Sequence, residues 1–363
     1  WLATLLVEPT PLPKLEFLDV IPAEQRTLIV VPGLLIRKAD ADALARRLEG
    51  HYLAARDPHV DIAMLTDFRD ATTETLPDDQ ELLDYARAKI RALNRHYGRR
   101  EDHGHQQPFH LFHRKRVWSA NQDRWMGWER KRGKLEELNR LLRGDASTSY
   151  VVHEGQAEHF AEFRHVLTLD ADTILPLGSG RRLIETLAHP LNRARFDAGE
   201  RVSAGYTVLQ PRVDLAPIDA PTRFSRIFAG DGAFDIYSRA VSDVYQDLFG
   251  EGIFVGKGIY AIDDFQRSVA HRMPEDRVLS HDLLEGVHGR AGLVTDVVVY
   301  EDYPVNWLSY ARRLHRWVRG DWQLLPWLGR VVPVGSGQRK PNRLGALARY
   351  KILDNLRRSL LSP

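Results

Sequence analysis

The chain has 363 residues, 43% of them hydrophobic, so it can bury a sizeable core as one large domain or as two lobes. Its formal net charge of +2 gives no general electrostatic case for binding nucleic acid. It contains no cysteine, which excludes disulfides and thiolate metal sites and is compatible with a reducing compartment. The sequence has no signal peptide and no run of about 18 apolar residues, so it predicts no membrane-spanning helix.

Strands and helices are predicted to alternate through the first half of the chain, after an extended, proline-rich lead-in over residues 1–25. Short apolar runs predict strands, and apolar residues at helical spacing predict helices. In chain order these are strand 27–32, helix 39–48, strand 59–67, helix 77–97, strand 109–113, helix 128–142 and strand 166–169. The alternation predicts an α/β fold with a mostly parallel, twisted sheet and helices on both faces.

The second half is less regular. Its pattern predicts a strand from residue 208, a mostly helical stretch over 222–249, a glycine-rich segment over 250–260, a strand over 294–299 and a tryptophan-rich basic helix over 306–327.

Two carboxylates, Asp170 and Asp172, follow the strand over residues 166–169. Alternate residues of a strand point to one side, and ligands of open α/β sheets bind at the carboxyl ends of strands. Because Mg²⁺ and Mn²⁺ usually take one or two carboxylates plus phosphate oxygens, the pair predicts a site for a metal-bound diphosphate. Two other interpretations stay open. The aspartates could cap helices, or they could belong to an Asp-x-Asp-type phosphatase, although that motif normally stands on the first strand of its fold.

Three further clusters could complete such a site. Asp67 closes an early strand and could accept hydrogen bonds from a nucleobase or ribose, or it could cap a helix. Lys131 and Lys134 stand at a helix start, where they could meet a diphosphate or form a solvated helix face. Asp282 follows His281. It could take the proton of a sugar hydroxyl or simply belong to a capped helix start.

Residues 312–322 combine several arginines with two tryptophans. Arg316 could neutralise a leaving diphosphate, and the indole of Trp317 offers a flat face to a sugar ring. Nucleic-acid surfaces also use arginine with aromatic residues, but the balanced net charge argues against one here.

In this order, the motifs resemble those of the GT-A glycosyltransferases that include the processive β-glycan synthases. The matching positions are Asp67, Lys134, Asp170 with Asp172, Asp282, and Arg316 with Trp317. The sequence is more similar still to the transferase domain of the cyclic β-1,2-glucan synthases, glycosyltransferase family 84. The runs that carry this resemblance are Met126–Leu135, Leu169–Thr173, Val241–Glu251, Gly256–Tyr260, Ser280–Leu283 and Arg316–Trp327.

The resemblance implies an inverting glucosyltransferase that uses UDP-glucose to elongate a linear β-1,2-glucan, with another β-glycan as the alternative product. It implies that Asp170 and Asp172 hold Mg²⁺ or Mn²⁺, that Asp282 is the general base and that Arg316 acts on the diphosphate. Arg313 stands where processive synthases have Gln, so its contact with acceptor or diphosphate stays open. The substrate-binding residues implied are Asp67, Lys131, Lys134, Gly256, Lys257, Arg313 and Trp317.

The resemblance also implies a larger, multi-pass membrane protein. Because the chain begins on Trp1 rather than Met, we expect a piece of such a protein, flanked by transmembrane segments and a further carbohydrate-active domain. UDP-glucose is cytosolic, which places the piece on the cytoplasmic face of the inner membrane. The expected parts are the lead-in 1–25, a GT-A domain 26–335 with a nucleotide-binding half 26–164 and a metal and acceptor half 165–335, and a membrane-proximal segment 336–363.

That last segment contains a basic amphipathic pattern. Its apolar residues recur at helical spacing, and basic residues stand between them. Such helices suit an anionic membrane surface, so interfacial helices are expected at the C-terminal end. A helix packed on the body of the protein is the alternative. The residues concerned are Leu344, Leu347, Ile352, Leu356 and Leu360, with Arg343, Arg349, Lys351, Arg357 and Arg358.

Two functions of other classes remain as alternatives to glycosyl transfer. One is a metal-dependent sugar phosphatase, and the other is an idle glycan-binding module. The joint presence of Asp170, Asp172 and Asp282 counts against the second, since a pure binder needs neither a metal nor a base.

Overall fold

The computed structural model describes residues 7–98, 107–155, 159–216, 222–224, 244–275, 277–279, 281–302, 304, 306–335 and 338–360. The chain divides into two compact units. The first unit comprises residues 13–190 and 257–266, and the second comprises residues 1–12, 191–256 and 267–363. The domain boundaries expected from the sequence stay a prediction.

The first unit is built on β1 (Thr27–Leu35), β2 (Val60–Phe68), β3 (Phe109–Arg114), β6 (Tyr150–Glu154), β7 (His165–Thr168) and β12 (Gly258–Ala261). They are ordered β6-β3-β2-β1-β7-β12. β1 pairs in parallel with β2 and β7, and β2 pairs in parallel with β3. β6 and β12 run antiparallel to their neighbours.

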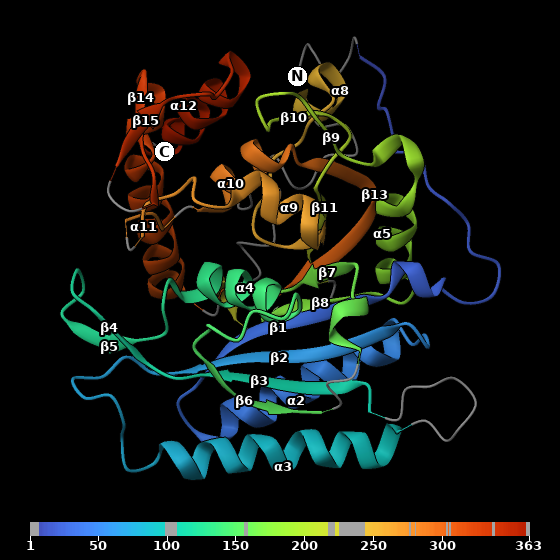
Figure 1. The fold of residues 1–363 in the computed structure, drawn as a ribbon, viewed down its shortest axis with the longest axis vertical. Helices are drawn as coiled ribbons and strands as arrows, with labels where there is room; N and C mark the ends of the chain where they lie inside the picture. Colours follow the sequence, from blue (N-terminus) through green and yellow to red (C-terminus); the bar gives the residue numbers. More distant parts are fainter. Residues whose placement is uncertain are drawn as a thin grey trace. The chain divides into compact units, whose positions relative to one another are not determined.

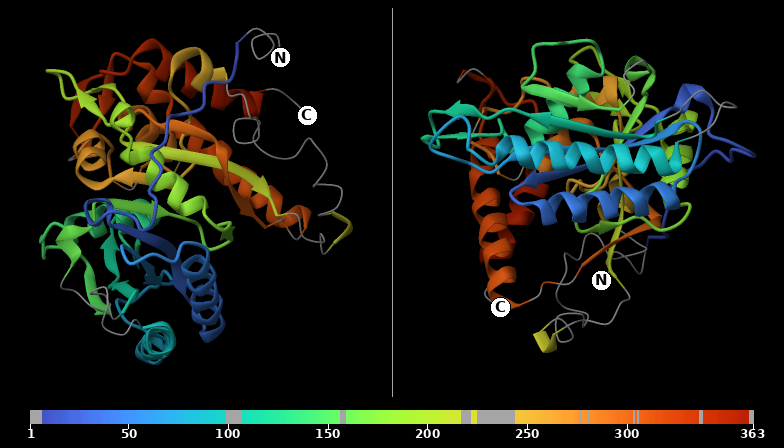
Figure 2. Two further views of the ribbon diagram at one scale, coloured as in Figure 1. Left: turned by 90° about the vertical axis from the view of Figure 1, so that its right-hand side faces the viewer. Right: turned by 90° about the horizontal axis from the view of Figure 1, so that it is seen from below.

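Helices cover both faces of these strands. Every residue of β2 is buried, which requires cover on both sides of the sheet. α2 (Lys38–Ala54) packs beside α3 (Asp79–Tyr97), and α4 (Arg130–Leu141) lies on the face opposite α2 (Figures 1 and 2). α5 (Ser179–Ala188) packs against β12. The shorter elements are η1 (Ala23–Gln25), the hairpin of β4 (Val117–Ser119) and β5 (Arg124–Met126), η2 (Phe160–Glu162) and β8 (Thr173–Ile174). η3 (Pro190–Asn192) and α9 (Ile262–Val269) begin in this unit and end in the second one.

The second unit contains β11 (Val208–Leu215) in parallel with β13 (Gly292–Glu301). Its helices are α8 (Val244–Phe249), α10 (His281–Gly289), α11 (Trp307–Gln323), η4 (Leu325–Leu328) and α12 (Ala346–Leu360), and its small ladders are β9 (Arg195–Phe196) with β10 (Val202–Ala204) and β14 (Val331–Pro333) with β15 (Arg339–Pro341). Of the helical stretch predicted over 222–249, residues 225–243 lie outside the described residues, as do Asp276 and Ser280.

Most of the predicted apolar face of α12 is covered by the protein, while Leu360 at its end is exposed. Leu344, Ile352 and Leu356 are buried, and the first two belong to a core cluster that includes residues of α10 and η4. Lys351, expected among the basic residues of a lipid-facing surface, is fully buried and donates to Glu251 and to the carbonyl of Gly252. The structure therefore supports the alternative in which this helix packs on the protein.

The predicted α/β class is confirmed, with a mostly parallel sheet and covering helices. Within the part of the chain that the structure describes, none of the helices combines the length and hydrophobicity needed to cross a bilayer.

Buried histidines make the stability of the first unit depend on pH. His51 on α2 is 1% exposed. Burial, helped by the charge of Arg47, lowers the pKa of His51 from 6.5 to about 3. Below pH 6.5 the unfolded histidine therefore binds a proton that the folded one does not. The free energy of unfolding thus falls as the pH drops from about 6.5 to about 3. The stability that the neutral, buried His51 contributes is fully present above this range.

We expect His51→Gln to lose less stability on acidification than the unsubstituted chain. One such histidine lowers the unfolding free energy by about 2 kcal/mol between about pH 7 and pH 5. Urea unfolding at the two pH values measures this loss. His96→Gln, at an exposed position of α3, is the control and should behave like the unsubstituted chain. Equal losses in both variants would contradict the role given to His51.

Candidate active site

The end of β7 presents the two predicted carboxylates in a tight turn. The N–H of Leu169 still bonds to the carbonyl of Val30 on β1, at 3.0 Å. The chain then reverses, and the N–H of Thr173 donates to the carbonyl of Asp170 at 3.0 Å. This turn brings carboxylate oxygens of Asp170 and Asp172 within 4.8 Å of each other. Both side chains are partly exposed, so the predicted pair forms at the carboxyl end of a central parallel strand.

Two lysines lie against Asp170. Lys131 Nζ is 2.5 Å from Asp170 Oδ1, and Lys257 Nζ is 3.2 Å from Oδ2. Lys131 is on α4, and Lys257 directly precedes β12. Burial by itself would raise the pKa of Asp170, but the two ammonium groups outweigh it and hold the pKa well below the ordinary range. Asp170 is therefore ionised under all ordinary conditions.

The Asp170–Asp172 pair fits a divalent metal by its donor type. Hard cations such as Mg²⁺ and Mn²⁺ prefer carboxylate oxygens, and Mg²⁺ is commonly bound through one or two carboxylates plus phosphate oxygens. Two partly exposed carboxylates supply the protein share of that set. Because ammonium groups contact both oxygens of Asp170, a metal ion must compete with them for this residue.

Asp67 and Lys134 also come together, but inside the protein. Lys134 Nζ lies 3.2 Å from Asp67 Oδ2 and donates to the carbonyl of Gly33 at 2.5 Å. Both side chains are almost fully buried. Burial would raise the pKa of Asp67, but Lys134 and Arg114 hold it below the ordinary value. The pKa of Lys134 is lowered, because burial and the neighbouring Arg114 charge outweigh its attraction to Asp67.

Arg114, which the sequence did not single out, ties this buried group together. Its guanidinium is 0% exposed and has five N–H donors. Two form a fork with Asp67, at 2.7 and 2.9 Å, and a third meets Glu137 at 2.8 Å. The remaining two reach the carbonyls of Trp128 and Arg130, at 2.9 and 3.1 Å. All five donors therefore have acceptors.

The turn that Arg114 holds carries backbone strain. Glu129 and Arg130 have φ values of 49° and 50°, which side chains other than glycine seldom adopt. Such residues cost on the order of 1–3 kcal/mol each and persist where their surroundings fix them. The two carbonyl contacts from Arg114 enclose these residues, and Lys131 follows directly. The buried arginine thus helps to set where the Lys131 side chain begins.

In the second unit, Asp282 stands in the first turn of α10. His281 Nε2 is 3.1 Å from Asp282 Oδ1, and Glu285 places a carboxylate oxygen within 4.8 Å of the ligand atoms of both. Gly256 has φ +84°, and a Cβ there would lie 2.7–2.9 Å from the Asp282 carboxylate. Glycine is therefore required at 256, both by its backbone angle and by the close approach of Asp282.

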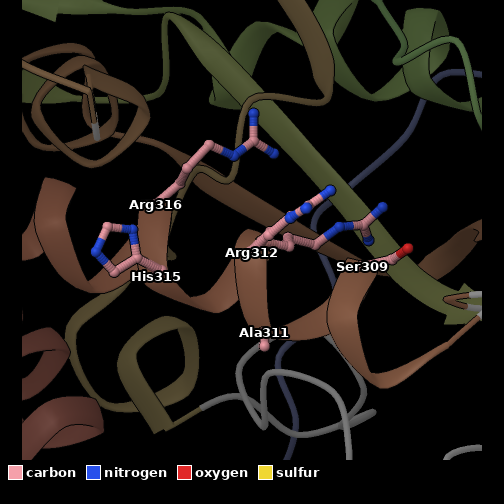
Figure 3. Close-up of a pocket in the computed structure, with 6 residues that line it drawn as sticks. Ser309, Ala311, Arg312, His315 and Arg316 are labelled. Atoms are coloured by element: carbon pink, nitrogen blue, oxygen red, sulfur yellow. The ribbon is translucent and has the colours of Figure 1, made fainter.

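A hollow of about 640 Å³ lies along α11. Its lining includes Arg312, Arg313 and Arg316, and in Figure 3 the guanidinium groups of Arg312 and Arg316 extend to the same side while His315 points elsewhere. Three arginines on one helix face form a surface suited to an anion. Trp317, on the same helix, is half-buried. The predicted site residues Arg313 and Arg316 therefore line one hollow, together with Arg312, which the sequence did not single out.

No family model matches the chain. It is 42% identical over 361 residues to the cyclic β-(1,2)-glucan synthase NdvB of Rhizobium meliloti (strain 1021). The chain is homologous to one segment of that synthase. The match takes in 99% of this chain and 12% of NdvB, so the chain spans only a small part of its relative. The resemblance expected from the sequence is confirmed by this identity.

Among solved structures, the galactosyltransferase LgtC in complex with donor and acceptor sugar analogues has a TM-score of 0.29 at 12% identity, over 73% of this chain and 72% of that one. A structure of an active-site mutant of LgtC has a TM-score of 0.28 at 11% identity, over the same shares. Both likenesses are distant.

Gly127→Ala tests the buried group around Asp67. A Cβ at this position would lie 2.3 Å from Asp67 Oδ2 and 3.0 Å from Arg114 Nη2, so the fork must shift. We expect a loss of about 1–3 kcal/mol in unfolding free energy, the usual cost of overpacking, measured by urea unfolding.

Gly50→Ala is the matched control, because a Cβ there meets nothing within 4 Å and Gly50 lies within α2. It should leave stability unchanged or raise it slightly. If both alanine variants were equally stable, the fork would not be the rigid element described.

Proposed function

We propose that the chain is the glycosyltransferase domain of a cyclic β-1,2-glucan synthase, which uses UDP-glucose to elongate a linear β-1,2-glucan with inversion at the anomeric carbon. The observation that carries the proposal is the 42% identity to NdvB over 99% of the chain. The paired carboxylates after β7 support it, because a sugar-nucleotide donor needs its diphosphate charge neutralised.

Residues of the first unit hold the donor. Asp170 and Asp172 bind Mg²⁺ or Mn²⁺, which would supply positive charge to the leaving diphosphate. Lys131 and Lys257, already beside Asp170, are the cations best placed to meet the phosphates. Asp67 and Lys134, expected to hold the uridine and the diphosphate of the donor, are buried, so we assign them to supporting the donor site from within.

Residues of the second unit act on the acceptor and the leaving group. Inversion requires one displacement: the acceptor oxygen bonds to C1 of glucose as the bond from C1 to the UDP oxygen breaks with its electron pair. The acceptor proton passes to Asp282, whose carboxylate packs closely against Gly256. Arg316 and Arg313 neutralise the departing UDP, and Trp317 lines the acceptor subsite.

The membrane context belongs to the longer protein. We propose that flanking segments span the inner membrane, that the chain works on its cytoplasmic face where UDP-glucose is available, and that cyclisation falls to another carbohydrate-active domain. A phosphatase, the alternative from another class, would release inorganic phosphate from sugar phosphates without UDP-glucose.

Asp172→Asn tests the metal site. The amide keeps the size of the side chain but removes a charged ligand, so we expect Mn²⁺-dependent binding of UDP to weaken at least about tenfold, the effect of roughly 1.4 kcal/mol. Isothermal calorimetry with UDP and Mn²⁺ measures it, and circular dichroism verifies that the fold is retained. An unchanged affinity would remove Asp172 from the metal site.

Asp282→Asn separates chemistry from binding. A general base is needed only when the acceptor hydroxyl attacks, and its loss typically costs on the order of 10² to 10⁴ in rate. We expect the variant to bind UDP normally and to elongate glucan at a rate lowered by that factor. Transfer of labelled glucose from UDP-glucose to a β-1,2-glucan primer measures the rate.

Two other carboxylates serve as comparisons for Asp282. Glu285 lies in the same cluster, so Glu285→Gln decides which of the two acids takes the proton. Glu275 is exposed in the same unit, and Glu275→Gln should leave the rate unchanged. An inactive Glu285→Gln beside an active Asp282→Asn would move the base to Glu285.

A further inference from the structure

The carboxylate of Asp170 is already neutralised by the protein itself. Lys131 contacts one oxygen at 2.5 Å and Lys257 contacts the other at 3.2 Å. Two ammonium groups thus contact both of the oxygens through which this residue would bind a divalent cation. Without a donor present, a metal ion must compete with them for Asp170, and two positive charges repel it as it approaches.

A nucleoside diphosphate changes this balance, because its phosphate oxygens are stronger partners for ammonium groups than one shared carboxylate. If the lysines move to the diphosphate, both oxygens of Asp170 become available. The metal ion can then bind between Asp170, Asp172 and the phosphates, which is the ligand set that Mg²⁺ and Mn²⁺ favour. The same two lysines would neutralise the phosphate charge.

We propose that Lys131 and Lys257 exchange partners, holding Asp170 before the donor binds and the diphosphate afterwards, so that the metal ion binds tightly only together with the nucleotide. The inference rests on the proposed function and deepens it by giving the order in which the donor site is filled. It makes metal and nucleotide binding cooperative, by the same factor in both directions.

The side chains are suited to such an exchange. Asp170, Lys131 and Lys257 are 33%, 23% and 11% exposed, so a ligand from solvent can reach the group. Lysine carries a compact charge on a flexible stem, which can swing between two acceptors. Arg114 offers the contrast: it is 0% exposed and its five donors are all used. The Asp170 group can reorganise where the Arg114 group cannot.

Calorimetric titration of the full chain with Mn²⁺, alone and in the presence of UDP, tests the exchange. We expect UDP to tighten Mn²⁺ binding at least about tenfold, within the usual range of coupling between two ligands. Lys131→Met and Lys257→Met should each bind Mn²⁺ alone several-fold more tightly, because a competitor is gone. Both should bind UDP with Mn²⁺ more weakly, because a phosphate partner is gone.

Arg130→Met is the matched control. It removes one positive charge from the residue next to Lys131, but Arg130 pairs with Asp70 at 2.8 Å rather than with Asp170. It should leave the affinity for Mn²⁺ alone unchanged. An equal rise in Arg130→Met and Lys131→Met would mean that charge in general opposes the metal, and would overturn the exchange.

Asp170→Asn distinguishes a failure of the exchange from a failure of the proposed metal site. Weakened binding of Mn²⁺ with UDP in this variant, beside unchanged affinity for Mn²⁺ alone in both methionine variants, would overturn the exchange and leave the site in place. Full retention of binding in Asp170→Asn would overturn the metal assignment, and the exchange with it. Weakened binding in Asp170→Asn together with tighter Mn²⁺ binding in the methionine variants supports both.

Discussion

The buried guanidinium of Arg114 is the contact on which the polar part of the first unit depends. It joins the end of β3 to Asp67 on β2 and to Glu137 on α4. It also holds the carbonyls on either side of the left-handed turn at Glu129 and Arg130. A fully desolvated arginine is tolerable only when every donor is satisfied. Replacing it would remove a donor from several buried acceptors at once, and among the described residues Asp67 and Glu137 would keep only Lys134 and Ser149 as partners.

The rigid group around Arg114 and the solvent-accessible group around Asp170 meet at adjacent residues of α4. Arg130 is part of the strained turn, and Lys131 is the first residue beyond it. A flexible side chain gives reproducible chemistry only if its backbone origin is fixed. We therefore interpret the Arg114 group as the rigid base that supports Lys131, while the exposure of Asp170 leaves that ion pair open to ligands from solvent.

Much of the strand and helix order follows from the sequence, because fully buried parallel strands produce apolar runs that few other structures share. The Asp170–Asp172 pair was predictable for the same reason, since it directly follows such a run. Side-chain contacts between distant segments were not. Lys134 was expected at the diphosphate yet lies against Asp67 and Gly33. Its acceptors stand on β2 and β1, far away in the sequence, and helical spacing alone does not reveal them.

Contacts between distant segments also decide the surroundings of α12, which the sequence could not predict. Its alternating apolar and basic residues are compatible with lipid or with protein, and periodicity cannot tell which surface covers the apolar face. Lys351 decides it: the ammonium group is buried and bonded to Glu251 and Gly252, an arrangement that lipid headgroups could not supply. A cation therefore serves the structure when its charge is buried and its acceptors belong to the protein, as for Lys351 and Arg114. A cation that is partly open to solvent, as Lys131 is, remains available to a ligand.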